Sequence, residues 1–171
     1  MLSLEQKQWL NNLSDTKTIS VIPYNPKNRM VFDKIKKDLI DNIGNVRVSL
    51  RGSTLLGISG QGEVDLYIPV AKKNFNSCLK KLTKYLGNPG SVYELRRVRF
   101  VKYIDDIKVE IFLINKNSRD WVNGCKFEKF LKHNPKYLNE YERIKKKCDG
   151  FSVRQYYTAK IKFINKILSK I

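Results

Sequence analysis

The sequence predicts an α/β (α+β) fold, a mixed sheet flanked by helices and followed by a helical C-terminal segment. Two observations predict it. Up to residue 114, segments with helical spacing of apolar residues alternate with segments that have the period-two pattern of strands. Beyond residue 120, only helical spacing remains. Such alternation is typical of a sheet with helices packed on it, and 171 residues suffice for one core, so we expect a single domain over residues 1–171.

Residues 1–44 are expected to form two helices joined by an extended segment. The first helix is short and amphipathic and lies within residues 1–13, and residues 19–24 are extended. Asn25 is suited to cap the second helix, with Pro26 at its first position and Gly44 as its stop signal. Helical spacing of apolar residues supports this helix at Val31, Phe32, Ile35, Leu39 and Ile43.

Two strands follow, separated by a glycine-containing loop. Apolar and polar residues alternate over residues 46–51, which predicts a half-buried strand. Gly52 and Ser53 are expected to form a turn, and three further glycines keep the loop backbone unrestrained. The strand pattern resumes at Glu63.

The remaining elements continue the alternation and then become helical. They are a helix over 75–86, strands over 92–103 and 108–114, and helices over 126–133, 135–148 and 152–171. A strong turn over 87–90 separates the first of these helices from the strands. Residues 104–107 close a hairpin, in which Asp105 and Asp106 are expected to serve only as turn residues.

Three acidic residues on the predicted strands form a candidate metal site. Glu63 and Asp65 are two residues apart, so both side chains point to one face of their strand. Glu110 interrupts an apolar strand, where a buried charge without a partner is costly. If the two strands pair, the three carboxylates converge. Three hard oxygen donors on rigid strands suit one or two Mg²⁺ ions that carry substrate phosphates.

The order of these motifs resembles a known superfamily. An apolar strand, Gly-Ser, an acid-x-Asp pair and a lone acid on a later strand are similar to the nucleotidyltransferase superfamily with the polymerase-beta-type catalytic core. From residue 19 to the C-terminus the chain resembles the GrpB family within that superfamily. The segments that carry this resemblance are VIPYNP (21–26), RGST (51–54) followed by Gly57 and Ile58, and FLKHNP (130–135) through Tyr141.

The resemblance implies a nucleotidyltransferase-like core over residues 19–115, with C-terminal helices over 120–171 packed on it. It also implies a metal-dependent transfer of an NMP from a nucleoside triphosphate to an acceptor, with Mg²⁺ or Mn²⁺ as cofactor. The metal ligands and catalytic residues would be Glu63, Asp65 and Glu110, and the nucleotide-binding residues would be Arg51, Gly52 and Ser53.

The sequence departs from the family pattern at two of the three acids. In the GrpB family an apolar residue commonly stands at the position of Glu63, and a histidine stands near that of Glu110. This chain has an acid at both positions. The departure favours an active, metal-binding transferase over a degenerate one.

The formal net charge of +18 results from 34 Lys and Arg against 16 Asp and Glu. Such a charge attracts polyanions, and it is also what a lysine-rich proteome would produce. The first explanation favours RNA, tRNA-like in kind, as the acceptor. Candidate nucleic-acid-binding residues are Arg96, Arg97, Arg99 and Lys102, although their alternation does not place all four on one face.

Two other functions are compatible with the same residues. One is a non-catalytic nucleotide- or RNA-binding module of the GrpB type, and the other is a toxin–antitoxin-type component that binds a protein. No apolar run is long enough to span a membrane and no signal peptide is recognised, so we expect a cytoplasmic protein without membrane contact. His133, the sole histidine, is expected to have a structural role at the Asn134–Pro135 break. The sequence does not indicate the oligomeric state.

Overall fold

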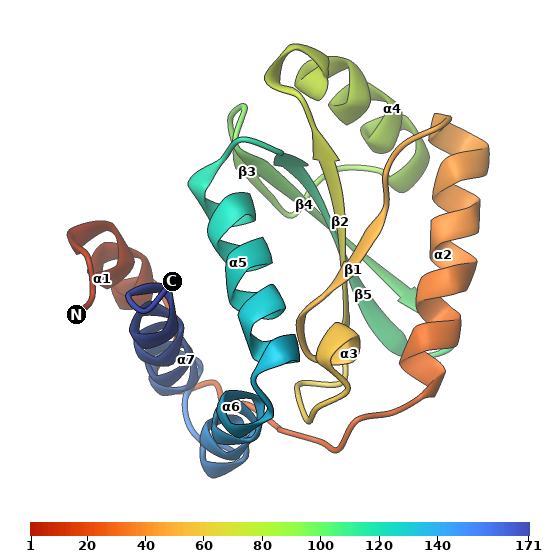
Figure 1. The fold of residues 1–171 in the computed structure, drawn as a ribbon. Helices are drawn as coiled ribbons and strands as arrows, with labels where there is room; N and C mark the ends of the chain where they lie inside the picture. The colour runs from red at the N-terminus through yellow and green to blue at the C-terminus, as the bar shows by residue number, and fades with distance from the viewer. The chain divides into compact units, whose positions relative to one another are not determined.

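The computed structural model describes residues 1–171 and contains a five-stranded sheet with the order β1-β2-β5-β4-β3 (Figure 1). The strands are β1 (Ser49–Arg51), β2 (Val64–Val70), β3 (Ser91–Tyr93), β4 (Arg97–Ile104) and β5 (Ile107–Asn115). β2 and β5 are parallel, and the other neighbouring pairs are antiparallel. The predicted α/β fold with a mixed sheet is therefore confirmed.

The helices precede, interrupt and follow the strands along the chain. They are α1 (Leu4–Asn11), α2 (Lys27–Ile43), α3 (Gly52–Leu56), the 3₁₀ helix η1 (Lys72–Asn74), α4 (Phe75–Leu86), α5 (Arg119–His133), α6 (Pro135–Lys147) and α7 (Val153–Leu168). Helix α2 begins one residue later than predicted, at Lys27, with Pro26 and not Asn25 as its N-cap. The Asn25 side chain still accepts a hydrogen bond of 3.0 Å from the backbone N–H of Lys27. The helical C-terminal segment is also confirmed.

One face of the sheet forms the main hydrophobic core with α2 and α4. Alternate residues of β2, such as Val64 and Leu66, are fully buried in this core. Leu39 of α2 and Leu82 of α4 are also fully buried there. The residues between them on the strands therefore point to the opposite face, where the acidic residues lie.

The single strand predicted over residues 92–103 was wrong, because the structure divides it into β3 and β4. These strands pair antiparallel, and a tight turn joins them. Leu95 in this turn has a positive φ of 52°, and the N–H of Arg96 donates a 3.0 Å hydrogen bond to the carbonyl of Tyr93. A leucine in this conformation is rare, so the sequence carries no ordinary turn signal here.

Two helix boundaries also differ from the predictions. Residues 52–56 form the short helix α3 and not a turn with a loose loop; it ends at Gly57, whose φ of 67° is left-handed. Helix α5 begins at Arg119, well before the predicted start at residue 126. By contrast, Asp105 and Asp106 have positive φ values of 49° and 63° in the β4–β5 hairpin, which confirms them as turn residues.

The chain divides into two compact units. The first comprises Met1–Pro23, Ile58–Gln61 and Asn123–Ile171, and the second comprises Tyr24–Gly57 and Gly62–Val122, including the whole sheet. The single domain over residues 1–171, with its C-terminal helices packed on the core, stays a prediction. None of the helices combines the length and the apolar composition that crossing a bilayer requires.

Within the first unit, Ser59 is joined to α6 through Glu142. The Glu142 carboxylate accepts hydrogen bonds from the backbone N–H of Ser59 at 3.0 Å and from its hydroxyl at 2.7 Å. The backbone hydrogen bond lowers the pKa of Glu142, partial burial opposes this, and the Ser59 hydroxyl and Lys146 lower it further, to about 2. Glu142 therefore stabilises the folded state most when it is ionised.

We expect Glu142→Gln to lower the free energy of unfolding at pH 7 by about 1–2 kcal/mol, the range of a charged hydrogen bond at a partly exposed site. Because the pKa is about 2 in the folded protein and 4.5 in the unfolded chain, the difference from wild type should disappear as the pH falls from 4.5 towards 2. Urea unfolding across this range measures it. Glu140→Gln, which removes only the ion pair with Lys166, is the control. A difference that is independent of pH would contradict the role of the charge.

Candidate active site

The structure brings Glu63, Asp65 and Glu110 together, and we call these three residues the acid cluster. Their nearest carboxylate oxygens all lie within 4.8 Å of one another. Glu110 is buried and the other two are half-buried. A donor set of three hard carboxylate oxygens at this separation fits Mg²⁺ or Mn²⁺, since both prefer oxygen ligands.

The parallel pairing of β2 and β5 produces this convergence. Asp65 is the direct register partner of Glu110, so the two side chains lie beside each other on the same face of the sheet. Glu63 comes immediately before β2 and two residues before Asp65, which places its carboxylate on the same side. The core on the other face fixes both strands, so the cluster has a rigid support.

Two cations compensate the acid cluster. Nζ of Lys108 lies 3.0 Å from Oε2 of Glu63 and 2.6 Å from Oε1 of Glu110. Nη1 of Arg99 donates a 3.0 Å hydrogen bond to the same oxygen of Glu110. A buried carboxylate without such partners would be strongly destabilising, so these contacts explain how Glu110 is tolerated in a buried strand.

The environment keeps Lys108 protonated. Burial lowers the pKa of its ammonium group, but the hydrogen bonds to Glu110 and Glu63 and their negative charges outweigh burial. The net effect raises the pKa of Lys108 above its usual range. Lys108 is therefore a permanent positive charge between two members of the acid cluster.

Gly52 lies directly against the acid cluster. A Cβ atom at this position would be 2.2 Å from Oδ2 of Asp65, well inside van der Waals contact, so the carboxylate would have to shift. Gly52 also has a φ of 67°, in the left-handed region that favours glycine. Glycine at position 52 therefore has a physical reason, because it leaves room for the Asp65 carboxylate.

Arg51 is buried on the same face as Asp65. Arg51 is the register partner of Asp65 across the β1–β2 pair, and only 8% of its surface is exposed. The centre of its guanidinium group lies 4.7 Å from the ring centroid of Trp121 and 5.4 Å from that of Tyr67. These cation–π contacts hold the Arg51 side chain within the protein, on the face of the sheet that carries Asp65.

The four predicted nucleic-acid-binding residues have three different environments. Arg97 and Arg99 alternate with the buried Val98 and Phe100, so both lie on the face of the acid cluster. Arg96 forms a bidentate ion pair with Asp120. The Lys102 ammonium lies on the core side of the sheet, 4.4 Å from the ring centroid of Tyr85 in α4. Only Arg97 and Arg99 therefore share a face with the acid cluster.

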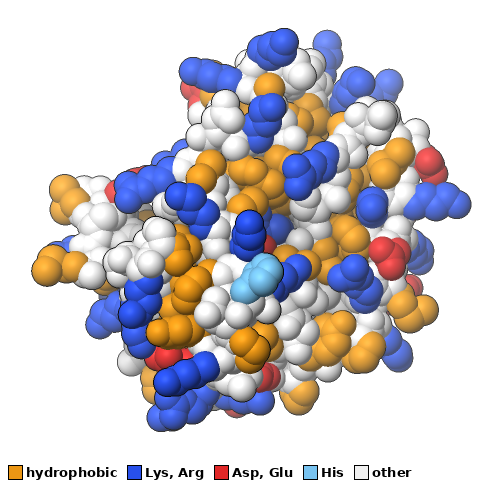
Figure 2. All heavy atoms as spheres, viewed as in Figure 1, with side chains coloured by type: hydrophobic (Ala, Val, Ile, Leu, Met, Phe, Trp, Pro, Cys, Tyr) orange, Lys and Arg blue, Asp and Glu red, His pale blue; other side chains and the backbone are white.

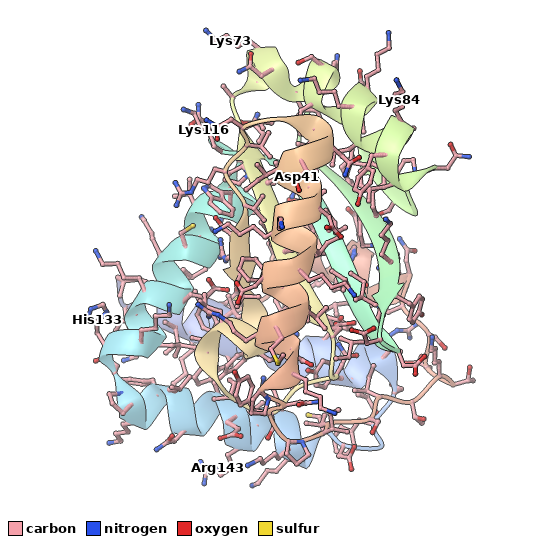
Figure 3. The ribbon with its side chains drawn as sticks, turned by 90° about the vertical axis from the view of Figure 1, so that its right-hand side faces the viewer. Asp41, Lys73, Lys84, Lys116, His133 and Arg143 are labelled. Atoms are coloured by element: carbon pink, nitrogen blue, oxygen red, sulfur yellow. The ribbon has the colours of Figure 1, made fainter.

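Two residues of the site were not found from the sequence. Lys108 is two residues from Glu110 on the same strand, a spacing that places both side chains on one face and is a usable signal. Trp121 packs against Arg51 from the first turn of α5, and no local pattern indicates this contact. His133, labelled in Figure 3, points outward at the end of α5 with Nδ1 2.7 Å from the Lys129 carbonyl oxygen.

The sequence matches one family profile over most of its length. The family is described as GrpB protein, and the match covers residues 18–170. No significant match was found among curated proteins.

Solved structures with a similar fold include conserved protein GrpB from Enterococcus faecalis, at a TM-score of 0.68 and 16% identity over 88% of this chain and 98% of that one. A chain of the GLD-2/RNP-8 complex has a TM-score of 0.50 and 14% identity, over 98% of this chain and 64% of that one. Cid1, described as having RNA terminal uridylyl transferase activity, has a TM-score of 0.49 and 11% identity, over 82% of this chain and 46% of that one. At these identities the likeness concerns the fold alone.

Proposed function

The chain belongs to the GrpB family, and we propose that it is a metal-dependent nucleotidyltransferase that moves an NMP from a nucleoside triphosphate to RNA. The observation that carries this proposal is the convergence of the acid cluster on adjacent strands of a nucleotidyltransferase-like fold. Glu63 and Glu110 also support a metal-binding site, because the family commonly has other residue types at these two positions.

The acid cluster would hold one or two divalent ions. Glu63 and Asp65 are proposed to bind the ion that accompanies the triphosphate, and Asp65 and Glu110 the ion near the acceptor. Bound at these carboxylates, Mg²⁺ or Mn²⁺ would neutralise phosphate charge and lower the pKa of the acceptor hydroxyl.

The proposed reaction exchanges one phosphorus–oxygen bond for another. The acceptor hydroxyl oxygen bonds to the α-phosphorus, the bond from that phosphorus to the oxygen bridging to the β-phosphate breaks, and pyrophosphate leaves. The hydroxyl proton passes to a carboxylate of the acid cluster. Gly52 and Ser53 are proposed to bind the outer phosphates, and the buried Arg51 to balance charge near Asp65.

The RNA acceptor is proposed to lie over β4, beside the acid cluster. Arg97 and Arg99 face this side, and the guanidinium group of Arg97 stacks 5.1 Å from the ring centroid of Tyr93. Tyr93 is 41% exposed, so a base could stack on it. The wider surface is suited to a polyanion: Figure 2 shows Lys and Arg side chains spread over the visible face, with few acidic side chains between them.

We expect Arg97→Ala to weaken the binding of single-stranded RNA and to reduce the slope of log K against log salt by about 0.7, the value for one phosphate contact. Fluorescence anisotropy at several salt concentrations measures both quantities. Arg96→Ala is the matched control, because the neighbouring Arg96 is already engaged by Asp120. Equal losses for the two variants would contradict the proposed acceptor surface.

The experiment that tests the proposed function incubates the protein with each α-labelled nucleoside triphosphate, Mg²⁺ or Mn²⁺, and total RNA. Label in RNA is the expected result, and comparison of the four nucleotides identifies the base. Bound nucleotide without transfer would replace this proposal with the non-catalytic binding module. Absence of both nucleotide and RNA binding would favour the toxin–antitoxin-type component.

A further inference from the structure

Lys108 uses the carboxylate oxygens that a metal ion in the acid cluster would need. Its Nζ contacts Oε2 of Glu63 and Oε1 of Glu110, and so bridges two of the three acids. The two carboxylates would repel each other strongly without a cation between them. An ammonium group and a divalent ion cannot both occupy this position at these distances.

We propose that Lys108 is a tethered counter-ion, which holds Glu63 and Glu110 together before a divalent ion binds and leaves them when it does. The inference rests on the proposed function, because it takes the acid cluster to be a metal centre. Lysine suits the role: its charge is compact, and its flexible four-carbon stem allows the ammonium to move while the backbone of β5 stays in place.

The exposure of the side chains indicates the route by which Lys108 leaves. The side chain of Lys108 is 36% exposed, against 15% for Glu63 and 10% for Glu110. Lys108 therefore lies on the solvent side of the carboxylates. Its ammonium can return to water by rotation of its own side chain, without separation of the packed strands.

Arg99 compensates Glu110 when Lys108 moves away. Its Nη1 already donates a 3.0 Å hydrogen bond to Oε1 of Glu110. This hydrogen bond does not involve Lys108, so Glu110 can keep it once the ammonium has left. The buried carboxylate thus keeps a cationic partner in both states.

Removal of the competing cation should increase metal affinity. We expect Lys108→Met to bind Mn²⁺ about tenfold more tightly than wild type, because the metal no longer has to displace an ion pair. The loss of free Mn²⁺ signal in electron paramagnetic resonance measures binding directly and does not depend on transfer activity. Lys108→Gln provides a second neutral variant if Lys108→Met folds poorly.

Two variants control for charge. Lys108→Arg keeps a cation beside the acids, and its Mn²⁺ affinity should stay close to that of wild type. Lys102→Met removes the same charge from the neighbouring strand, where the ammonium contacts Tyr85 on the other face of the sheet. Its effect on Mn²⁺ affinity should be much smaller than that of Lys108→Met.

The outcomes separate the inference from the proposed function. If wild type binds Mn²⁺ and the neutral variants at position 108 bind it no more tightly, Lys108 is not displaced, and the inference alone fails. If Lys102→Met increases affinity as much as Lys108→Met, the effect is one of net charge, and the inference also fails. If neither wild type nor the neutral variants bind Mn²⁺, both the inference and the metal centre fail.

Discussion

Asp65→Asn is expected to reduce nucleotidyl transfer by about 10³-fold or more, equivalent to ~4 kcal/mol of transition-state stabilisation. Asp65 is the ligand that both proposed ion positions share. It lies two residues after Glu63 and is the register partner of Glu110 on the neighbouring strand. The substitution preserves the shape of the side chain and removes its charge. Transfer of α-label at saturating Mg²⁺ measures the effect.

The fold should survive this substitution, because asparagine keeps the size and shape of the aspartate side chain. We therefore expect the melting temperature without metal to stay close to that of wild type, and the stabilisation by Mn²⁺ to be lost. Asp41→Asn is the control: Asp41 is exposed on α2, as labelled in Figure 3, and its substitution should change neither quantity. Full transfer activity in Asp65→Asn would remove the acid cluster from the mechanism.

Gly52→Ala is expected to lower transfer by about 10²-fold, the effect of moving a catalytic group by roughly 1 Å. The added Cβ would meet Oδ2 of Asp65 at 2.2 Å, so the carboxylate must shift. The left-handed φ of 67° adds a cost of about 1–2 kcal/mol to the free energy of folding. Transfer rates and urea unfolding together measure both effects.

Gly57→Ala is a closely matched control for this variant. Gly57 has the same φ of 67°, but a Cβ atom there would meet nothing within 4 Å. It should therefore show a similar loss of stability with transfer close to wild type. If Gly57→Ala lost as much activity as Gly52→Ala, backbone strain and not the position of Asp65 would explain both.

The acid cluster could be anticipated because its cause is local. The spacing of Glu63 and Asp65 places both on one face of a strand whatever surrounds it. Glu110 in an apolar run required a charged partner, and this requirement indicated a site. The direct register of Asp65 with Glu110 could not be predicted, since it depends on a parallel pairing between segments far apart in the sequence.

The elements that the sequence did not predict depend on contacts made elsewhere in the fold. The β3–β4 turn places a leucine, Leu95, at a positive φ, so composition gave no sign of it. Helix α3 is five residues long and has a glycine at its first position and as its C-cap, a pattern that resembles a loop. The first residues of α5 include Asn123 and Gly124, which are poor helix formers, although the Ser118 hydroxyl accepts a hydrogen bond from the Trp121 N–H.

Within the site, too, the features that the sequence did not predict depend on contacts between distant segments. The resemblance implied that Arg51 binds the nucleotide, but its burial against Trp121 and Tyr67 depends on α5 and β2 and could not be predicted. The alternation along the strand predicted that the four basic residues do not share one face, and the structure places Lys102 on the face opposite Arg97 and Arg99. Arg96 lies in the turn, where this alternation no longer applies.

The most direct test of the metal centre is a crystal structure with Mn²⁺ and a non-hydrolysable nucleoside triphosphate. The predicted result is anomalous density between the carboxylates of Glu63, Asp65 and Glu110, at a coordination distance of about 2.1 Å, with the triphosphate bound to the same ion. The ammonium of Lys108 should then lie away from Glu63 and Glu110. Nucleotide bound with no anomalous density at the acid cluster, and with Lys108 still bridging the acids, would contradict the account.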